Sequence, residues 1–176
     1  MIEVNSVILA EALKQILTSN DRSKHPTRPV LAGVNLKLEN DILTLASLDG
    51  YMITKYIVPV SNPEDDSWDV TVETFKIDPK SYTALDFEDG HLIIMQPGLR
   101  QSIKVFYDSY PKYDQMFPDA EPEYTISLDP AKLARLVKGL KETITLEFHG
   151  KLNPVVIKPA ATDEWEKMLL PVRVNK

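Results

Sequence analysis

The alternation of apolar and polar residues at the start of the chain predicts a strand, a helix and three further strands. Residues 2 to 5 form a short apolar run, and Ser6 is a typical N-cap for a helix over residues 7 to 18. The apolar positions of this helix recur at helical spacing: Leu9, Leu13, Ile16 and Leu17. Strand-like runs follow at residues 30–38, 42–47 and 51–60. The first sixty residues therefore predict the order β-α-β-β-β.

The last third of the chain repeats this order at a spacing of about 120 residues. Residues 124–128 predict a strand, and Asp129 with Pro130 predicts the start of a helix over residues 131 to 141. Its buried stripe would be Leu133, Leu136, Val137 and Leu140. Three strands are then expected within residues 143–150, 154–160 and 167–174.

The middle third is rich in strand patterns and predicts no helix beyond a single turn at residues 78–85. An acidic run at 61–67 is typical of a solvated linker. We therefore expect an α+β fold with mainly antiparallel sheets in two domains. Residues 1–118 would hold a first unit, 1–60, and a helix-poor second unit, 66–118, and residues 119–176 would hold one C-terminal β-α-β-β-β unit.

Composition narrows the class of protein. The 176 residues, 43% hydrophobic and 26% charged, can bury a substantial core, and the apolar runs are too short to cross a bilayer. Because the chain has no cysteine, disulfides, thiolate zinc ligands and thiol catalysis are excluded. The first residues lack the pattern of a signal peptide. These features together predict a cytoplasmic protein.

The sequence contains no recognisable catalytic constellation. Its histidines, at 25, 91 and 149, lack metal-ligand spacing, and no glycine-rich phosphate loop or nucleophile motif is present. We therefore expect neither a bound metal nor a cofactor, and we do not expect an enzyme.

Basic residues gather on and after both predicted helices although the net charge is −6. Such residues on one helix face can neutralise DNA phosphates without reading bases, and a solvated surface is the alternative interpretation. The candidates for contact with DNA are Lys14, Arg22, Lys24, Lys132, Arg135, Lys138 and Lys141.

A set of apolar residues falls in loops and at strand ends, and Pro171 interrupts the closing run MLLPVRV. Such residues can line a groove for a peptide side chain, or they can simply close a core. The set comprises Leu31, Leu48, Met52, Ile53, Met116, Phe117, Leu169, Leu170, Pro171 and Val172.

Three strings resemble the bacterial sliding clamp, the beta subunit of DNA polymerase III. RPVLAGVNLKLENDILTLASLDGYMIT is similar to an R-P-x-L-x-G-V strand and the strand after it, which ends in A-T-D-G-H-R-L. YPKYDQMFP resembles the family's Y/F-P-D-Y segment, and NPVVIKP followed by MLLPVRV resembles its closing strands. In the family pattern Thr, His and Arg stand where this chain has Leu48, Tyr51 and Met52, and Met stands at Leu170.

The resemblance implies a shortened processivity-clamp fold and carries over the clamp's partner-binding cleft. In the family, polymerases and other replication proteins insert a short linear motif into this hydrophobic pocket. The matching positions are Arg28, Leu31, Leu48, Gly50, Tyr51, Met52, Ile53, Pro111, Met116, Leu169, Leu170, Pro171, Val172 and Arg173.

Two functions follow as expectations. One is a sliding-clamp-like accessory protein that binds DNA polymerase or other replication-protein peptides and encircles double-stranded DNA non-specifically as a homo-oligomer. The other is a clamp mimic or adaptor that binds the same partners without encircling DNA. The oligomeric state distinguishes them, and the sequence leaves it open.

Overall fold

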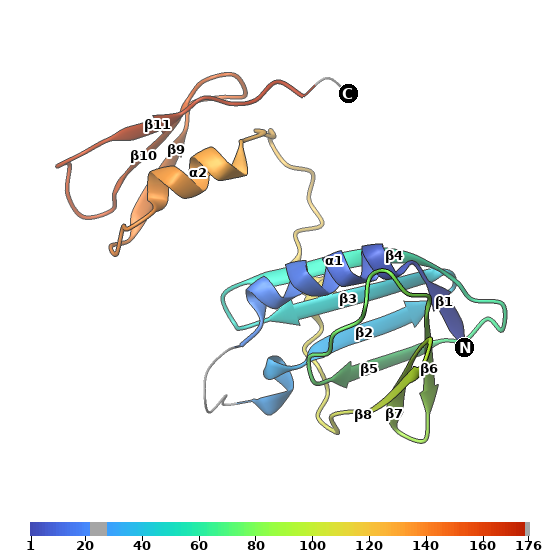
Figure 1. The fold of residues 1–176 in the computed structure, drawn as a ribbon. Helices are drawn as coiled ribbons and strands as arrows, with labels where there is room; N and C mark the ends of the chain where they lie inside the picture. Colours follow the sequence, from blue (N-terminus) through green and yellow to red (C-terminus); the bar gives the residue numbers. More distant parts are fainter. Residues whose placement is uncertain (22–27, 175–176) are drawn as a thin grey trace. The chain divides into compact units, whose positions relative to one another are not determined.

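Two units of unequal size make up the chain in the computed structural model, which describes residues 1–21 and 28–174. They comprise Met1–Phe117 and Pro118–Lys176 and are called unit 1 and unit 2 (Figure 1). The α+β class with antiparallel sheets is confirmed, since every strand pairing in both units is antiparallel. None of the helices in the described ranges is long and apolar enough to cross a membrane.

Unit 1 is built on one eight-stranded sheet whose ends almost meet. Its strand order is β5-β2-β3-β4-β1-β6-β7-β8. The two outer strands approach each other at a bridge between Val72 and Val105, and the Phe106 N–H donates to the Thr71 carbonyl at 2.8 Å. The elements are β1 (Ile2–Val4), α1 (Ser6–Ile16), η1 (Leu17–Ser19), η2 (Pro29–Ala32), β2 (Val34–Glu39), β3 (Ile42–Leu48), β4 (Ile53–Ser61), β5 (Trp68–Val72), β6 (Thr83–Glu88), β7 (His91–Gln96), β8 (Leu99–Lys104) and η3 (Tyr113–Met116).

Strand β1 joins the two halves of this sheet. It pairs with β4 on one side and with β6 on the other. The first half of unit 1, β1 to β4, and the second half, β5 to β8, therefore belong to one sheet. Ile2 and Val4 on β1 are buried. The acidic run at 61–67 lies inside unit 1, from the end of β4 to the start of β5.

Helix α1 covers this core next to β3 and β4 (Figure 1). Its N-cap is Asn5 and not the predicted Ser6, because the Asn5 side chain accepts from the Val7 and Ile8 N–H groups at 3.0 and 3.2 Å. The Ser6 hydroxyl turns inward instead and bonds to the Ser81 carbonyl and the Thr83 hydroxyl. The buried positions of the helix include Leu9, Ala12, Leu13 and Ile16.

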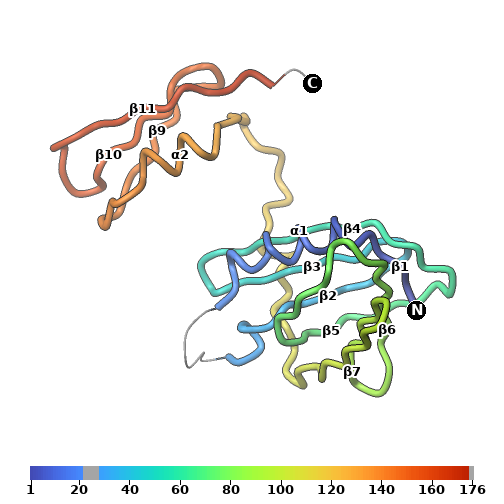
Figure 2. The backbone as a smooth tube through the Cα atoms, viewed as in Figure 1, coloured from blue at the N-terminus to red at the C-terminus, as the bar shows by residue number. Residues whose placement is uncertain are grey.

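Residues 73 to 82, all described, form no helix, as the sequence predicted for this third of the chain. This segment is the green loop between β5 and β6 in Figure 2. It places Phe75 in the main core and Ile77 against that core. An extended segment with two apolar anchors thus connects β5 to β6, where the first half uses α1.

Unit 2 holds one helix and one three-stranded sheet in the order β11-β10-β9. The Asp129 N-cap is confirmed, since its carboxylate accepts from the Ala131 and Lys132 N–H groups. The helix ends at Val137, earlier than predicted, because Lys138 leaves the helical conformation with a ψ of 127° and Gly139 has a φ of +82°. The elements are α2 (Pro130–Val137), β9 (Ile144–Phe148), β10 (Val155–Pro159) and β11 (Lys167–Leu169).

Three strand predictions are wrong in part or in full, and one of these strands, expected at 167–174, ends at Leu169. Residues 29 to 32 form the short helix η2 before β2 starts at Val34, since Pro29 has no N–H for a ladder and suits the first helical position. Residues 124–128 are not part of a sheet, although Ser127 accepts one hydrogen bond from the Val172 N–H at 2.8 Å.

Candidate functional site

A small hydrophobic cluster, separate from the main core, lies at the end of β3 in unit 1. Buried Ala46, Leu48 and Tyr113 form its centre, and partly buried side chains pack against them. We call this group the Leu48 cluster: Leu31, Ala46, Leu48, Ile53, Tyr110 and Tyr113. The predicted cleft residues Leu31, Leu48 and Ile53 are therefore brought together by η2, β3 and β4.

Two tyrosines that the sequence analysis did not select complete this cluster. Their rings meet edge to face with centroids 6.2 Å apart. The Tyr110 hydroxyl accepts from the Leu48 N–H at 3.1 Å. Burial raises the pKa of Tyr110 to about 12 and also raises that of Tyr113, because both phenols lose water. Both side chains therefore stay neutral, and the spacing Y-P-K-Y was their only signal in the sequence.

Polar contacts hold the segment 109–117 against the first half of unit 1. The Lys55 ammonium lies 3.0 Å from an Asp114 carboxylate oxygen and 4.9 Å from the centre of the Phe117 ring. The Arg28 guanidinium donates to the Ser109 carbonyl at 3.2 Å. Arg28 thus fixes the connecting segment.

Exposed apolar side chains come from the two chain segments next to the Leu48 cluster. Tyr51, Met52 and Met116 are 98%, 51% and 54% exposed. The turn before β4 presents the first two, because the Asp49 carboxylate accepts from the Tyr51 and Met52 N–H groups and Gly50 adopts a φ of +95°. These hydrogen bonds lower the pKa of Asp49.

The other predicted cleft residues in unit 1 differ in their surroundings. Leu48 is buried, so it can form the floor of a binding surface but not its wall. Pro111 lines a separate cavity of about 290 Å³ together with Asn35, Lys37 and residues of η3.

The C-terminal cleft candidates are described within unit 2 alone. Leu169 is buried as the last residue of β11, and its role there is core closure. Leu170 and Val172 are exposed. Pro171, Val172 and Arg173 line a groove of about 510 Å³ with Thr125, Ser127, Lys151, Leu152 and Val174.

The candidate DNA-facing residues are surface side chains wherever the structure describes them. Lys14 lies 3.8 Å from Glu11 on α1, and Lys132 lies 3.4 Å from the cap Asp129 on α2. Arg135, Lys138 and Lys141 are exposed. Arg22 and Lys24 fall outside the described residues.

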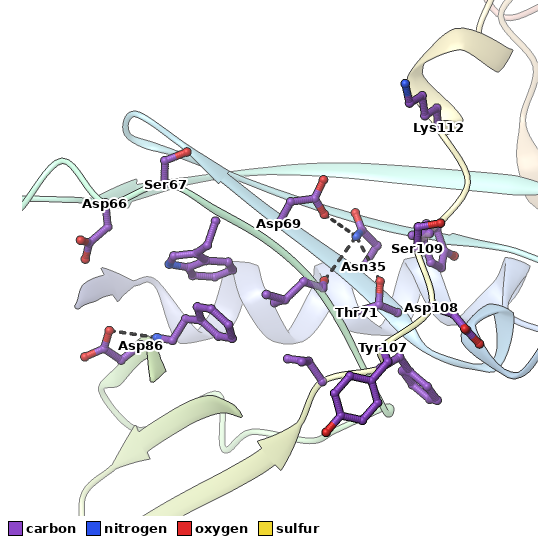
Figure 3. Close-up of a pocket in the computed structure, with 16 residues that line it drawn as sticks. Asn35, Asp66, Ser67, Asp69, Thr71, Asp86, Tyr107, Asp108, Ser109 and Lys112 are labelled. Carbon is purple, nitrogen blue, oxygen red and sulfur yellow. Dashed lines mark hydrogen bonds between the residues drawn. The ribbon is translucent and has the colours of Figure 1, made fainter. Parts of the chain in front are cut away.

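A larger cavity, of about 800 Å³, lies between β5 and residues 105–112 (Figure 3). Its lining combines apolar side chains with several carboxylates, and the sequence analysis did not predict it. The buried Asn35 amide donates to Asp69, to the Val70 carbonyl and to Thr71 at 2.7, 3.3 and 3.2 Å. The carboxylates on its lining are Asp66, Asp69, Asp86 and Asp108.

These carboxylates do not converge on a metal site. Among the described residues, no group of three His, Cys, Asp or Glu side chains could hold a metal ion. Asp66 and Asp86 instead face the Met1 ammonium at 2.6 and 3.6 Å, together with Glu64 at 2.7 Å. Its hydrogen bonds to the Asp66 and Glu64 carboxylates raise the pKa of this ammonium to about 10.

No family model and no curated protein matches the chain, but solved structures do. The sliding clamp of Bacillus subtilis is 16% identical, with a TM-score of 0.60 over 99% of this chain and 64% of the clamp chain. The Caulobacter crescentus DNA polymerase III beta subunit is 20% identical, with a TM-score of 0.64 over 97% and 51%. A Helicobacter pylori beta clamp bound to a DNA ligase peptide is 19% identical, with a TM-score of 0.66 over 97% and 51%.

This likeness shows that the chain has the fold of bacterial sliding clamps, as the sequence resemblance implied. The chain spans between about half and two thirds of the length of these clamps.

Proposed function

We propose that this protein is a sliding-clamp-like accessory factor of DNA replication, without enzymatic activity, that binds short peptide segments of DNA polymerase or other replication proteins. The observation that carries the proposal is the Leu48 cluster together with the exposed residues Tyr51, Met52 and Met116. The fold shared with clamps, one of which is solved with a DNA ligase peptide, supports it.

The chemistry of this surface fits an aliphatic or aromatic peptide side chain. Its floor is apolar, and the two buried phenols are held neutral, so an inserted side chain would meet no charge there. Met52 and Met116 are unbranched and adapt to irregular partners. Each apolar anchor that becomes buried contributes about 1.5–3 kcal/mol, so a peptide with a few anchors would bind with a Kd on the order of micromolar.

We also propose that exposed Leu170, Val172 and Arg173, with half-buried Pro171, form a peptide-contacting surface of unit 2. Pro171 has no N–H for a sheet ladder, and β11 ends at Leu169, so the segment after it keeps its side chains available.

A binding titration tests the peptide surface. The labelled DNA ligase peptide of the H. pylori complex would be titrated with the parent protein and followed by fluorescence anisotropy. Met52→Ala should weaken binding about tenfold, since one anchor contact of about 1.4 kcal/mol is lost. Leu99→Ala, which removes a similarly exposed apolar side chain from β8, should leave the affinity unchanged. No binding by the parent would refute the proposal.

Contact with DNA is the second part of the proposed function. Exposed Lys132, Arg135, Lys138 and Lys141 would neutralise phosphates regardless of sequence, and several copies would be needed to close a ring. Binding to double-stranded DNA should then weaken steeply with salt. Equal affinity at low and high salt would contradict these contacts.

Two observations favour a second candidate, a clamp mimic that binds the same peptides without encircling DNA. The second half of unit 1 has an extended segment at 73–82 instead of a helix, and the net charge is −6. A surface that carries fewer helices and an acidic balance is less suited to surround DNA. Peptide binding without DNA binding at any salt concentration would support the mimic.

A further inference from the structure

Unit 2 contains one set of a strand-like segment, a helix and three strands, whereas unit 1 contains two sets, the second without a helix, and this difference leaves the core of unit 2 open. The N-caps Asn5 and Asp129 align the two helices, so the apolar positions of α1 have counterparts on α2 and, for Ile16, just after its end. The α1 positions are buried and the α2 positions are only half-buried. The pairs are Leu9 with Leu133, Ala12 with Leu136, Leu13 with Val137, and Ile16 with Leu140.

The sheet of unit 2 also leaves apolar side chains incompletely buried, at its β9 edge. Leu146 and Phe148 lie opposite Ile157 and Val155 and share their face, yet they are 42% and 46% exposed while their partners are buried. In unit 1 the corresponding strand β2 is buried, and β5 of the second half pairs along its outer edge. In the described part of unit 2, no strand pairs along the outer edge of β9.

A segment suited to such an edge exists in unit 2, but none of the described strands pairs with it. Residues 124–128 alternate between half-buried Tyr124, Ile126 and Leu128 and exposed Thr125 and Ser127, which is the pattern of a strand with one covered face. The Val172 N–H bonds to the Ser127 carbonyl, as the Phe106 N–H bonds to the Thr71 carbonyl on β5. Residues 124–128 therefore take the place of β5, but no strand of the described unit 2 takes the place of β2 beside them.

Within one chain the Tyr124 hydroxyl donates to the Phe148 carbonyl at 3.3 Å, but no backbone ladder joins the two edges among the described residues. Residues 124–128 lie beside residue 172, which follows β11, and β9 lies at the opposite end of the order β11-β10-β9. A second copy related by a two-fold axis offers β9 to the first copy's 124–128 and takes the first copy's β9 in return. The same strand pairing then forms twice, once on each side of the two-fold axis, as an isologous interface requires.

We propose that unit 2 associates with unit 2 of a second copy, so that the two sets complete one domain built like unit 1. The β2–β5 pairing of unit 1 supplies the register, with Asn35 opposite Thr71 and Leu36 opposite Val70. In the dimer, Ser127 of one copy lies opposite Thr145 of the other, Ile126 opposite Leu146, and Tyr124 opposite Phe148.

This pairing buries the residues that unit 2 leaves exposed. Leu146 and Phe148 gain aliphatic and aromatic cross-strand neighbours, and the half-buried stripe of α2 faces its counterpart across the new core. The proposal stands on the architecture of unit 2 and does not rest on peptide or DNA binding.

Engineered disulfides test the register, because the chain has no cysteine of its own. The Thr71 carbonyl points away from β2, so Asn35 and Thr71 form a non-hydrogen-bonded pair, and Ser127 and Thr145 would form the same kind of pair. Cα atoms in such pairs are about 4.5 Å apart, within reach of a disulfide. A mixture of Ser127→Cys and Thr145→Cys proteins should form a covalent dimer under mild oxidation, and each variant alone should not.

A second measurement tests the interface without cysteines. By light scattering, the parent protein should have the mass of an even number of chains, and Leu146→Asp should halve it. Met168→Asp changes an exposed apolar residue on the other face of the sheet and should leave the mass unchanged. Circular dichroism would verify that both variants are folded. A monomeric parent, or cross-linking that is equal in the single variants and in the mixture, would overturn the proposal.

Discussion

Removal of the Phe75 side chain tests whether this residue completes the core in the second half of unit 1, which has no helix. Phe75 is 6% exposed and belongs to the main core, although it sits in an extended segment between two strands. Phe75→Ala should therefore destabilise unit 1 as a core substitution would, and not as a change in a surface loop would.

The expected loss lies at the low end of the range for buried phenylalanine. Removal of a buried phenyl ring costs about 3–5 kcal/mol. Phe75 borders a groove of about 620 Å³ with Leu17 and Ile103, so water and neighbouring side chains can fill the vacated space. We expect a loss of about 3 kcal/mol in the free energy of unfolding of unit 1.

Urea unfolding followed by tryptophan fluorescence measures this loss. Trp68 reports on unit 1 and Trp165 on unit 2, so the experiment uses a Trp165→Phe background. With a slope of about 2 kcal/mol per molar urea, the midpoint should fall by about 1.5 M. Phe87→Ala deletes the same ring at a site that is 36% exposed and should cost less than half as much. A loss below about 1 kcal/mol for Phe75→Ala would refute the reasoning.

Three further predictions concern single sites. Gly33→Ala should cost about 1–3 kcal/mol in the same assay, because its Cβ would lie 2.7 Å from the Val72 carbonyl oxygen, where the ends of the sheet meet. Burial raises the pKa of Tyr110 to about 12, so unit 1 should lose stability as the pH rises from about 10 towards that value, and Tyr110→Phe should lose less. Asp129→Ala removes two hydrogen bonds from the start of α2 and should destabilise unit 2 by about 1 kcal/mol, read from Trp165 in a Trp68→Phe background.

Local chemistry explains which elements the sequence could predict. Apolar spacing placed α1 and α2, and Asp129 was identified as a cap because its neighbours are not caps. Ser6 and Asn5 are both good caps, and only the burial of Ser6 against Ser81 and Thr83 decides between them. The strand expected at 124–128 has the right alternation, but a strand needs a neighbour, and that is a tertiary property.

The candidate site, too, could be predicted from the sequence only in part. The apolar residues at 31, 48 and 53 were selected together, and they do form one cluster. Leu48 and Leu169 are buried, however, so position at a strand end did not distinguish floor residues from exposed ones. The two tyrosines were missed because a pair of aromatic residues three apart in a proline-containing segment gives no periodic signal. The acidic cavity joins β5 to residues 105–112, and no local pattern connects segments so far apart.

The peptide surface is the central claim, and the methyl groups of the five methionines test it most directly. In a protein labelled with ¹³C at the methionine methyls, addition of the DNA ligase peptide should shift the NMR signals of Met52 and Met116. The signals of Met1 and of Met95 on β7 should stay in place. Unmoved Met52 and Met116 signals at a saturating peptide concentration would contradict the account.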